Sequence, residues 1–314
     1  MLWGRHHTMR CTEHLAGFLA IALGTGACQP SLPTKPEQKE VKISRDLDCG
    51  GKPFQEGREV HLLVKDDGIR ISNCRITGTI RVLGLTRNGN GAANRESSYR
   101  PGHTQRAQDA ASRGVIIEGN TIISTYTIPI YAGPGVTDLT IRGNTFQGKG
   151  KSVVVYLDAE SARNTIEGNT FAFRSLVREV VAVDGSAQNR IADNDFQRID
   201  RGGIYLYRNC GEAGAVRHQP PRENIIEGNR FATGTLLPLI THRVPYRPAA
   251  IVLGSRNGSA SYCDDDKGYS FGSSADDRDQ ADFNIVRANI FTGSGRQVVD
   301  NGKQNAVQSI GSAR

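Results

Sequence analysis

An alternation of apolar and polar positions recurs along most of this chain. Six segments share it: VIIEGNTI (115–122), LTIRGNTF (139–146), NTIEGNTF (164–171), NRIADNDF (189–196), NIIEGNRF (224–231) and NIVRANIF (284–291). In the second segment, the alternation predicts a strand that points Leu139, Ile141 and Phe146 inward, with a corner at Gly143-Asn144. Asn tolerates the left-handed backbone conformation that such a corner requires. Asparagines stacked on successive coils can hydrogen-bond in a ladder, so we expect them to be scaffold.

The shared asparagines recur at a nearly constant interval. They are Asn120, Asn144, Asn169, Asn194, Asn229 and Asn289, with spacings of 24, 25, 25, 35 and 60 residues. A period near 25 residues predicts a solenoid. The two long spacings fit this period with insertions of roughly ten residues, the second also skipping one coil. A weaker copy, IRISNCRI (69–76), places Asn73 47 residues before Asn120.

A second strand is expected before each corner: TIPIYAG (127–133), SVVVYLD (152–158), VVAVD (180–184) and GIYLYRN (203–209). The inward side chains would be Ile128, Ile130, Val153, Val155, Leu157, Val181, Val183, Ile204 and Leu206. The solvent-facing alternates would be Tyr131, Tyr156, Asp158, Asp184, Tyr205, Tyr207 and Asn209.

Spacing places these outward side chains in two columns. Tyr131 and Tyr156 each lie 13 residues before their corner asparagine, so they should stack on adjacent coils. With a one-residue adjustment, Asp158, Asp184 and Asn209 stack beside them, while Ala182 and Tyr207 extend the tyrosine column. Flat tyrosine rings pack well on pyranose faces, which predicts binding of a sugar, although tyrosine is also simply favoured in strands.

This repeat resembles right-handed parallel β-helix proteins, a group that includes pectate and alginate lyases, polygalacturonases, mannuronan epimerases, phage tailspikes and NosD-type periplasmic proteins. The resemblance covers about residues 41–310. It implies an all-β, single-stranded right-handed parallel β-helix, a scaffold that supports unrelated functions. The catalytic motifs of the group mostly do not carry over. Arg243-Val-Pro-Tyr-Arg247, for example, is one residue shorter than the Arg-x-Pro-x-x-Arg motif of pectate lyases. The subfamily is therefore not identified.

The start of the chain has the features of a secretion signal. Arg5 and Arg10 precede an apolar run from Leu15 to Leu23, which is followed by small residues up to Ala27. Cys28 directly after Gly-Ala resembles the lipidated cysteine of bacterial lipoproteins, the alternative being a plainly cleaved signal. We expect a signal at 1–27, a tether at 28–40 and a β-helix domain at 41–314, with insertions near 84–113, 209–223 and 233–283. The protein would be exported, either periplasmic or anchored in the outer membrane through lipid.

The composition and net charge favour some fold classes and binding partners over others. The chain has 36 Gly among 314 residues and a formal net charge of +7, which favours many turns and disfavours disorder or a coiled coil. A basic exported protein is suited to an anionic polysaccharide, and no nucleic acid partner is expected. After signal removal and lipidation of Cys28, four cysteines remain. Among three possible pairings we favour Cys49–Cys74 and Cys210–Cys263.

The densest polar segment is the insertion that follows GIYLYRN. β-Elimination and C5 epimerisation of a uronate both remove the proton α to a carboxylate, which requires a cation and a base. Arg208 or Arg217 would neutralise the carboxylate, His218 would be the base, and Tyr205 or Tyr207 the acid.

Three alternatives stay open. Ca²⁺ is a candidate cofactor, because an acidic stretch in 233–283 offers carboxylate oxygens, but the stretch lacks EF-hand or nonapeptide calcium spacing, which favours a solvated loop. Asp158 and Asp184 would form a hydrolase pair if adjacent coils lie about 4.8 Å apart, near the roughly 5–5.5 Å of retaining enzymes. The last alternative is a non-catalytic, surface-anchored carbohydrate-binding or structural solenoid.

Overall fold

The computed structural model describes residues 39–85, 91–124, 127–208, 215–233, 248–254 and 281–308. The proposed signal, the lipidation site Cys28, and Asn209, Cys210 and Cys263 lie outside these ranges, as do the acidic residues between 264 and 279. Residues 38–314 form one compact unit, whose first strand begins two residues before the predicted boundary at 41.

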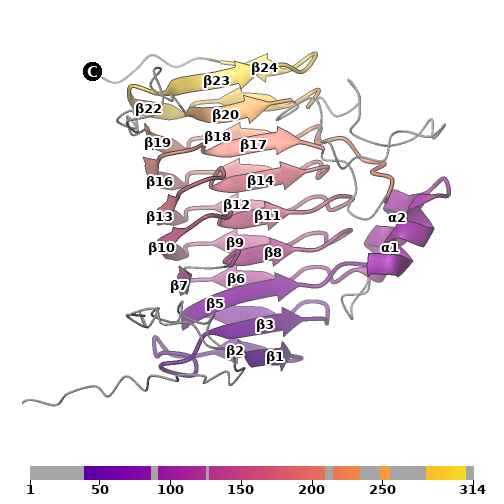
Figure 1. Ribbon diagram of the computed structural model, residues 1–314, viewed down its shortest axis with the longest axis vertical. Helices are drawn as coiled ribbons and strands as arrows, with labels where there is room; N and C mark the ends of the chain where they lie inside the picture. Colours follow the sequence, from indigo (N-terminus) through magenta and orange to yellow (C-terminus); the bar gives the residue numbers. More distant parts are fainter. Residues whose placement is uncertain are drawn as a thin grey trace, which may run out of the picture. The chain divides into compact units, whose positions relative to one another are not determined.

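The described strands pair in parallel and stack coil upon coil (Figure 1). Each complete coil contributes one strand to each of three faces, which we name sheets A, B and C. Sheet A contains β1 (Lys39–Ile43), β3 (Val60–Val64), β8 (Ile130–Ala132), β11 (Val155–Leu157), β14 (Val181–Asp184), β17 (Ile204–Tyr207), β20 (Ala249–Leu253) and β23 (Arg296–Asp300).

Sheet B contains β2 (Leu47–Asp48), β4 (Arg70–Ser72), β6 (Ile116–Glu118), β9 (Thr140–Arg142), β12 (Thr165–Glu167), β15 (Arg190–Ala192), β18 (Ile225–Glu227), β21 (Ile285–Arg287) and β24 (Ala306–Val307). Sheet C contains β7 (Thr121–Ser124), β10 (Thr145–Gly150), β13 (Thr170–Ser175), β16 (Asp195–Ile199), β19 (Arg230–Thr233) and β22 (Ile290–Gly293). The long strand β5 (Arg75–Val82) begins in sheet C and ends in sheet A.

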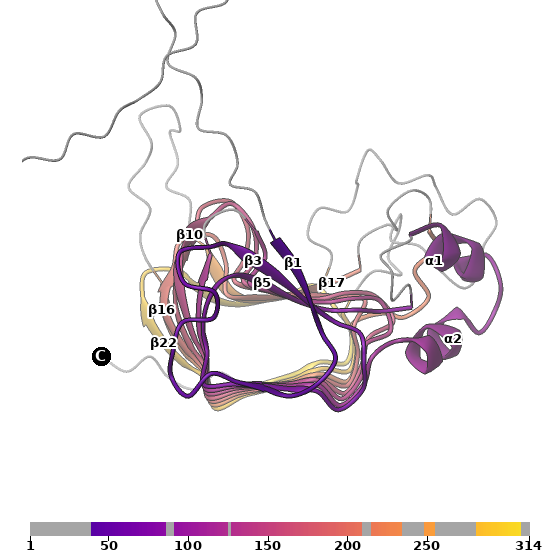
Figure 2. The same ribbon diagram turned by 90° about the horizontal axis from the view of Figure 1, so that it is seen from below.

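This architecture confirms the predicted right-handed parallel β-helix. Figure 2 looks along the solenoid and shows its three-sided section. Two helices, α1 (Gly91–Ser98) and α2 (His103–Ala110), lie in the insertion predicted at 84–113, outside the turn that leads from sheet A to sheet B. No helix in the described ranges is long and apolar enough to cross a membrane.

The core is a set of aligned apolar columns. Phe146, Phe171, Phe196 and Phe231 stack in order with ring centroids 4.9, 4.6 and 4.6 Å apart, and Phe291 follows at 5.4 Å. Burial of each such side chain contributes about 1.5–3 kcal/mol. The parallel register places identical positions of the repeat directly above one another, so the inward direction predicted for Phe146 is correct.

The predicted asparagine ladder is present, with one change at the corner. The Nδ2 of Asn144 donates to Oδ1 of Asn169 over 3.1 Å, and the Nδ2 of Asn169 donates to Oδ1 of Asn194 over 2.9 Å. The left-handed conformation is adopted by the preceding residue, as at Gly143 (φ 60°) and Gly168 (φ 61°), and not by the ladder asparagines as predicted. The asparagine is needed instead for its amide, which bonds to the neighbouring coils.

A second asparagine ladder begins the strands of sheet B and was not predicted. It contains Asn164, Asn189, Asn224, Asn284 and Asn305, joined through side-chain amides over 2.8–3.2 Å. The first four of these residues open the repeat segments quoted above. Their recurrence was therefore visible in the sequence.

The long spacings each correspond to a single coil. β19 pairs directly with β22, aligning Phe231 with Phe291, so the prediction that the 60-residue spacing skips a coil is wrong. The extra residues extend turns of one coil. Likewise β4 pairs directly with β6, and the backbone N–H of Cys74 donates to Oδ1 of Asn120 over 2.9 Å. Cys74, and not Asn73, therefore occupies the ladder position.

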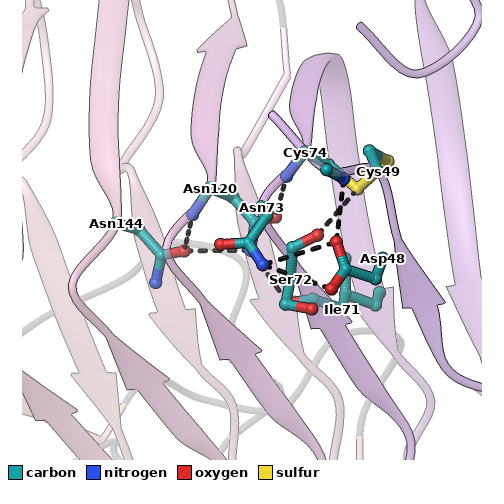
Figure 3. The surroundings of a disulfide bond; sticks show 9 residues. Asp48, Cys49, Ile71, Ser72, Asn73, Cys74, Asn120 and Asn144 are labelled. Carbon is teal, nitrogen blue, oxygen red and sulfur yellow. Dashed lines mark hydrogen bonds between the residues drawn. A yellow bond between two sulfur atoms is a disulfide. The ribbon is translucent and has the colours of Figure 1, made fainter. Parts of the chain in front are cut away.

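The predicted disulfide Cys49–Cys74 joins the first two coils (Figure 3). Its Cα atoms are 4.8 Å apart, and it lies at the end of the first asparagine ladder. Asp48 accepts a hydrogen bond from Asn73 beside it. The disulfide thus links the first coil to the second at the position where the asparagine ladder ends.

Candidate functional site

The outward residues at the C-terminal ends of the sheet A strands are covered. The backbone N–H of Val216 donates to Ser98 Oγ over 2.9 Å, and that of His218 donates to Glu160 Oε1 over 2.8 Å. Segment 215–220 is thereby tied both to α1 and to the turn after β11. Asp158 is buried beneath this cover and Asp184 is 0% exposed, although the alternation predicted both in solvent.

Strand register corrects the two predicted columns. Tyr131, Tyr156, Ala182 and Tyr205 align across β8, β11, β14 and β17. Tyr207 aligns with Asp184, so Tyr205 and not Tyr207 extends the tyrosine column.

The inward direction predicted for Ile128 and Val153 is wrong. Both pack outside sheet A in an apolar cluster with Tyr156. The strands start only at Ile130 and Val155, so alternation does not extend back into the preceding turns.

A network of tyrosines, carboxylates and one arginine lies under the cover. The Tyr131 hydroxyl donates to Asp158 Oδ2 over 2.5 Å, and the Tyr156 hydroxyl donates to Asp184. Arg217 Nη1 donates to Asp158 Oδ1 over 2.8 Å, a buried ion pair between residues 59 apart in sequence. The structure therefore brings together five residues that the sequence singled out. Asp158 accepts hydrogen bonds from Tyr131 and Arg217, and Asp184 accepts one from Tyr156.

The charges of this network fix its protonation. Burial raises the pKa of the Tyr131 and Tyr156 hydroxyls, and Asp158 and Asp184 respectively raise it further. Burial lowers the pKa of Arg217, but the carboxylates of Asp158 and Asp184 outweigh this and hold it above its ordinary value. At neutral pH, both tyrosines are hydroxyl donors and Arg217 is a cation.

The remaining predicted catalytic residues are less closely grouped. The Tyr207 hydroxyl donates to Glu179 Oε1 over 2.7 Å, and the Tyr205 hydroxyl bonds the Arg201 carbonyl over 3.1 Å. Arg208 is buried and donates to the carbonyl of His218 over 3.3 Å. The hydroxyls of Tyr205 and Tyr207 thus point toward the N-terminal ends of the sheet A strands. Arg217 and His218 lie at the C-terminal ends of these strands.

Sequence reasoning missed His103, which lies against His218 with ring centroids 5.1 Å apart. His103 Nδ1 is 3.1 Å from Ser97 Oγ, and His218 Nε2 is 2.8 Å from the Ser98 carbonyl. Burial, followed by the charges of His218, Arg106 and Arg217, lowers the pKa of His103 to about 4. His103 is therefore neutral at physiological pH, and no periodic signal marked it, because it belongs to an insertion.

An accessible edge borders this covered network. The Arg81 guanidinium lies 5.0 Å from the ring centroid of Tyr131, whose ring is 5.8 Å from that of Tyr156. Arg81 is exposed and both rings are half-buried. We call Arg81, Tyr131 and Tyr156 the rim. Arg81 also was missed, since the sequence of β5 lacks the tyrosine that marks the next two coils.

A separate groove of about 500 Å³ follows the corner between sheets B and C. Gly119, Gly143 and Gly168 form part of its floor, with Glu118, Arg142 and Glu167 along it. Hydrogen bonds from Arg142 and Arg70 outweigh desolvation and lower the pKa of Glu118. Glu118 pairs with Arg142 and Arg70, and Glu167 pairs with Arg190, as in a solvated mixed-charge surface.

Together, the coils, ladders and covered outer face define a parallel β-helix protein. A family model described as periplasmic copper-binding protein (NosD) matches residues 44–200, half of the 314-residue chain. The chain belongs to this NosD family. The family is periplasmic, which supports the prediction of an exported protein.

Solved structures similar to the chain include phage tailspikes. A tailspike of E. coli bacteriophage HK620 in complex with pentasaccharide has 11% identity and a TM-score of 0.42, covering 80% of this chain and 38% of its own. The Dettilon tailspike has 13% identity and a TM-score of 0.23, covering 86% of this chain and 61% of its own. The chain thus spans less than two thirds of these tailspikes. No curated protein matches it.

The family's description names copper, which proteins bind through His, Cys and Met side chains. Within the described ranges, no three His, Cys, Asp or Glu side chains are grouped as a metal site requires. His103 and His218 lie together, but each has a ring nitrogen at hydrogen-bond distance from a serine. The described residues do not fit a copper site, and the network above is explained without one.

Proposed function

We propose that this exported β-helix protein binds an anionic, uronate-containing polysaccharide at the rim. The supporting observation is the pair of neighbouring tyrosine rings, 5.8 Å apart and tilted by 30°, beside the exposed guanidinium of Arg81. Pyranose rings have apolar faces that pack on aromatic rings, and a guanidinium matches the planar, bidentate geometry of a carboxylate. One sugar ring with its carboxylate is the smallest ligand that uses both features.

The rim is held rigidly from below. Asp158 and Asp184 accept the hydroxyls of Tyr131 and Tyr156, so neither ring has to be ordered when a ligand arrives. Preorganised side chains avoid the loss of about 0.5–1.5 kcal/mol that each immobilised side chain otherwise costs. The buried carboxylates therefore serve binding by positioning the rings, without contacting the sugar.

A second candidate function is β-elimination or C5 epimerisation of the same uronate. It is favoured by Arg217 and His218, which lie side by side in a segment packed on Asp158 and Glu160. Arg217 would neutralise the carboxylate, His218 would accept the α proton, and Tyr205 or Tyr207 would protonate the leaving oxygen. Burial raises the pKa of the Tyr207 hydroxyl, which therefore stays protonated at neutral pH and has a proton to donate. This reaction requires segment 215–220 to leave Arg217 accessible. It also requires a tyrosine hydroxyl that points to the start of the sheet A strands to act on the same sugar as His218 at their end, so we rank it below binding.

Hydrolysis by Asp158 and Asp184 has less support. Both carboxylates are buried, and each already accepts a tyrosine hydroxyl. A hydrolase needs one carboxylate at the glycosidic oxygen and the other at the anomeric carbon or its attacking water.

We further propose that a lipid on Cys28 anchors the protein, on the strength of the signal-like sequence before it. Mass spectrometry of the mature N-terminus should find a diacylated Cys28. An unmodified N-terminus at another residue would contradict this.

The function is tested by calorimetric titration with alginate, polygalacturonate, hyaluronan and heparin, with neutral dextran as the control. Ultraviolet absorbance of unsaturated uronate is recorded in parallel, with and without Ca²⁺. Binding to a uronate polymer without a rise in absorbance is the expected result. A rise would assign elimination instead, and binding of dextran alone or of nothing would contradict the proposal.

A further inference from the structure

The ends of strands β10, β13 and β16, together with the turns that lead from them to sheet A, carry an excess of cations in three successive coils. We name this surface the C–A corner; its cations are Lys149, Lys151, Arg174, Arg178, Arg198 and Arg201. The same turns contain two carboxylates, Glu179 and Asp200. Six positive and two negative side chains leave a local charge of +4.

Both carboxylates of the C–A corner are buried and held by its arginines. Asp200 accepts hydrogen bonds from Arg174 Nε at 2.6 Å and Arg198 Nε at 2.9 Å, and Glu179 accepts one from Arg178 at 2.8 Å. Although burial raises the pKa of Asp200, the two arginines lower it on balance. The carboxylates therefore fix the arginines in place while the excess positive charge remains at the surface.

The charged side chains of sheet B differ from those of the C–A corner. In the described ion pairs of sheet B and the turns at its edges, seven arginines meet seven carboxylates. The positive charges of these ion pairs are therefore balanced by carboxylates. Lys149 and Lys151 are exposed, and neither has an ion-pair partner among the described residues. Among the described residues, the C–A corner thus carries an excess of positive charge that the ion pairs of sheet B do not show.

The cations are repeated along the solenoid axis. Lys149 aligns with Arg174 on the next coil, and neighbouring strands lie about 4.8 Å apart. A linear polyanion parallel to the axis would meet positive charge on each coil. Val177, which is 55% exposed, lies among these charges and offers an apolar contact to a sugar face.

The C–A corner is continuous with the outer face of sheet A. Arg178 Nη2 donates to the Tyr207 hydroxyl over 2.6 Å, which links the corner to β17. Lys151 precedes Tyr156 of the rim by five residues. A polymer bound at the rim therefore has a positively charged path beside it.

We propose that the C–A corner binds a linear anionic polysaccharide along the solenoid axis, as an extended contact for the polymer whose sugar ring packs at the rim. The class of partner rests on the proposed function. The corner adds length selectivity, because a short oligosaccharide fills the rim alone whereas a polymer also reaches the lysines.

The test compares K149Q/K151Q with R142Q/R163Q, a control that removes the same charge from sheet B. Long polygalacturonate and trigalacturonate are titrated into each full-length protein. We expect K149Q/K151Q to weaken polymer binding about 3- to 30-fold, as loss of two surface charge pairs predicts, with trigalacturonate unchanged. R142Q/R163Q should change either affinity less than twofold.

Equal polymer binding by wild type and K149Q/K151Q would overturn the inference while leaving the rim intact. An equal loss in the sheet B control would overturn it too, because net charge alone would then explain the effect. Loss of binding to phosphatidylglycerol vesicles, with polygalacturonate binding retained, would assign the corner to a membrane and reject the polysaccharide. If instead R81Q leaves trigalacturonate binding unchanged while K149Q/K151Q weakens the polymer, the corner stands and the rim function fails.

Discussion

Replacement of Arg217 by methionine probes the cover over sheet A. The side chain is 8% exposed and pairs with Asp158, which is equally buried, over 2.8 Å. Methionine preserves much of the volume but leaves the carboxylate of Asp158 buried without its cation. Removal of one partner from a buried ion pair costs about 3–5 kcal/mol. Arg217→Met should therefore lower the free energy of unfolding by about that amount, since the Tyr131 hydroxyl and the Ala159 N–H only partly stabilise the charge.

Urea unfolding followed by circular dichroism measures this loss. The matched control is Arg163→Met, which breaks a 3.2 Å pair with Asp138 in which both side chains are about half exposed. Such surface pairs contribute about 0–1 kcal/mol. The double variant Arg217→Met with Asp158→Asn should recover part of the loss, because no uncompensated charge remains. Equal effects of Arg217→Met and Arg163→Met would refute the assignment of a buried, covered pair.

Three further predictions concern the scaffold and its cover. Asn169→Ala should cost about 2–4 kcal/mol in urea unfolding, because it removes the amide that bonds Asn144 and leaves buried polar groups unpaired; a loss below 1 kcal/mol would show that the ladder is dispensable. Because the pKa of His103 falls from 6.5 to about 4 on folding, its contribution to the unfolding free energy should be level above pH 6.5 and decline by up to about 3 kcal/mol toward pH 4. The difference between wild type and His103→Gln should follow this curve, and a pH-independent difference would contradict it. Reduction of Cys49–Cys74, which closes a separation of 25 residues, should lower the unfolding free energy by about 3.5 kcal/mol, and an unchanged midpoint in dithiothreitol would argue against its role.

The periodic part of the structure could be predicted because it is local and repeated. Each coil must place an apolar side chain such as Phe171 inward and an amide such as Asn169 at the corner, so both recur at the coil length. The second ladder, which includes Asn189, recurs with the same period and could equally have been predicted from the sequence.

The cover over the candidate site could not be predicted in the same way. It depends on single contacts between distant segments, such as Val216 with Ser98, which are 118 residues apart. Insertions have no period, so alternation alone placed Asp184 in solvent when it is buried. His103 and Arg81 were missed for the same reason: each acts through a neighbour that only the folded coils bring close.

The central claim, that the rim binds a uronate, is tested most directly by titration of trigalacturonate into wild type and Arg81→Gln. Arg81 is exposed and its contact with Tyr131 is a surface one, so this variant keeps the buried network intact. Loss of one charge-assisted contact to the carboxylate predicts binding about 10- to 100-fold weaker, with Arg142→Gln unaffected. Equal affinity of wild type and Arg81→Gln would contradict the account.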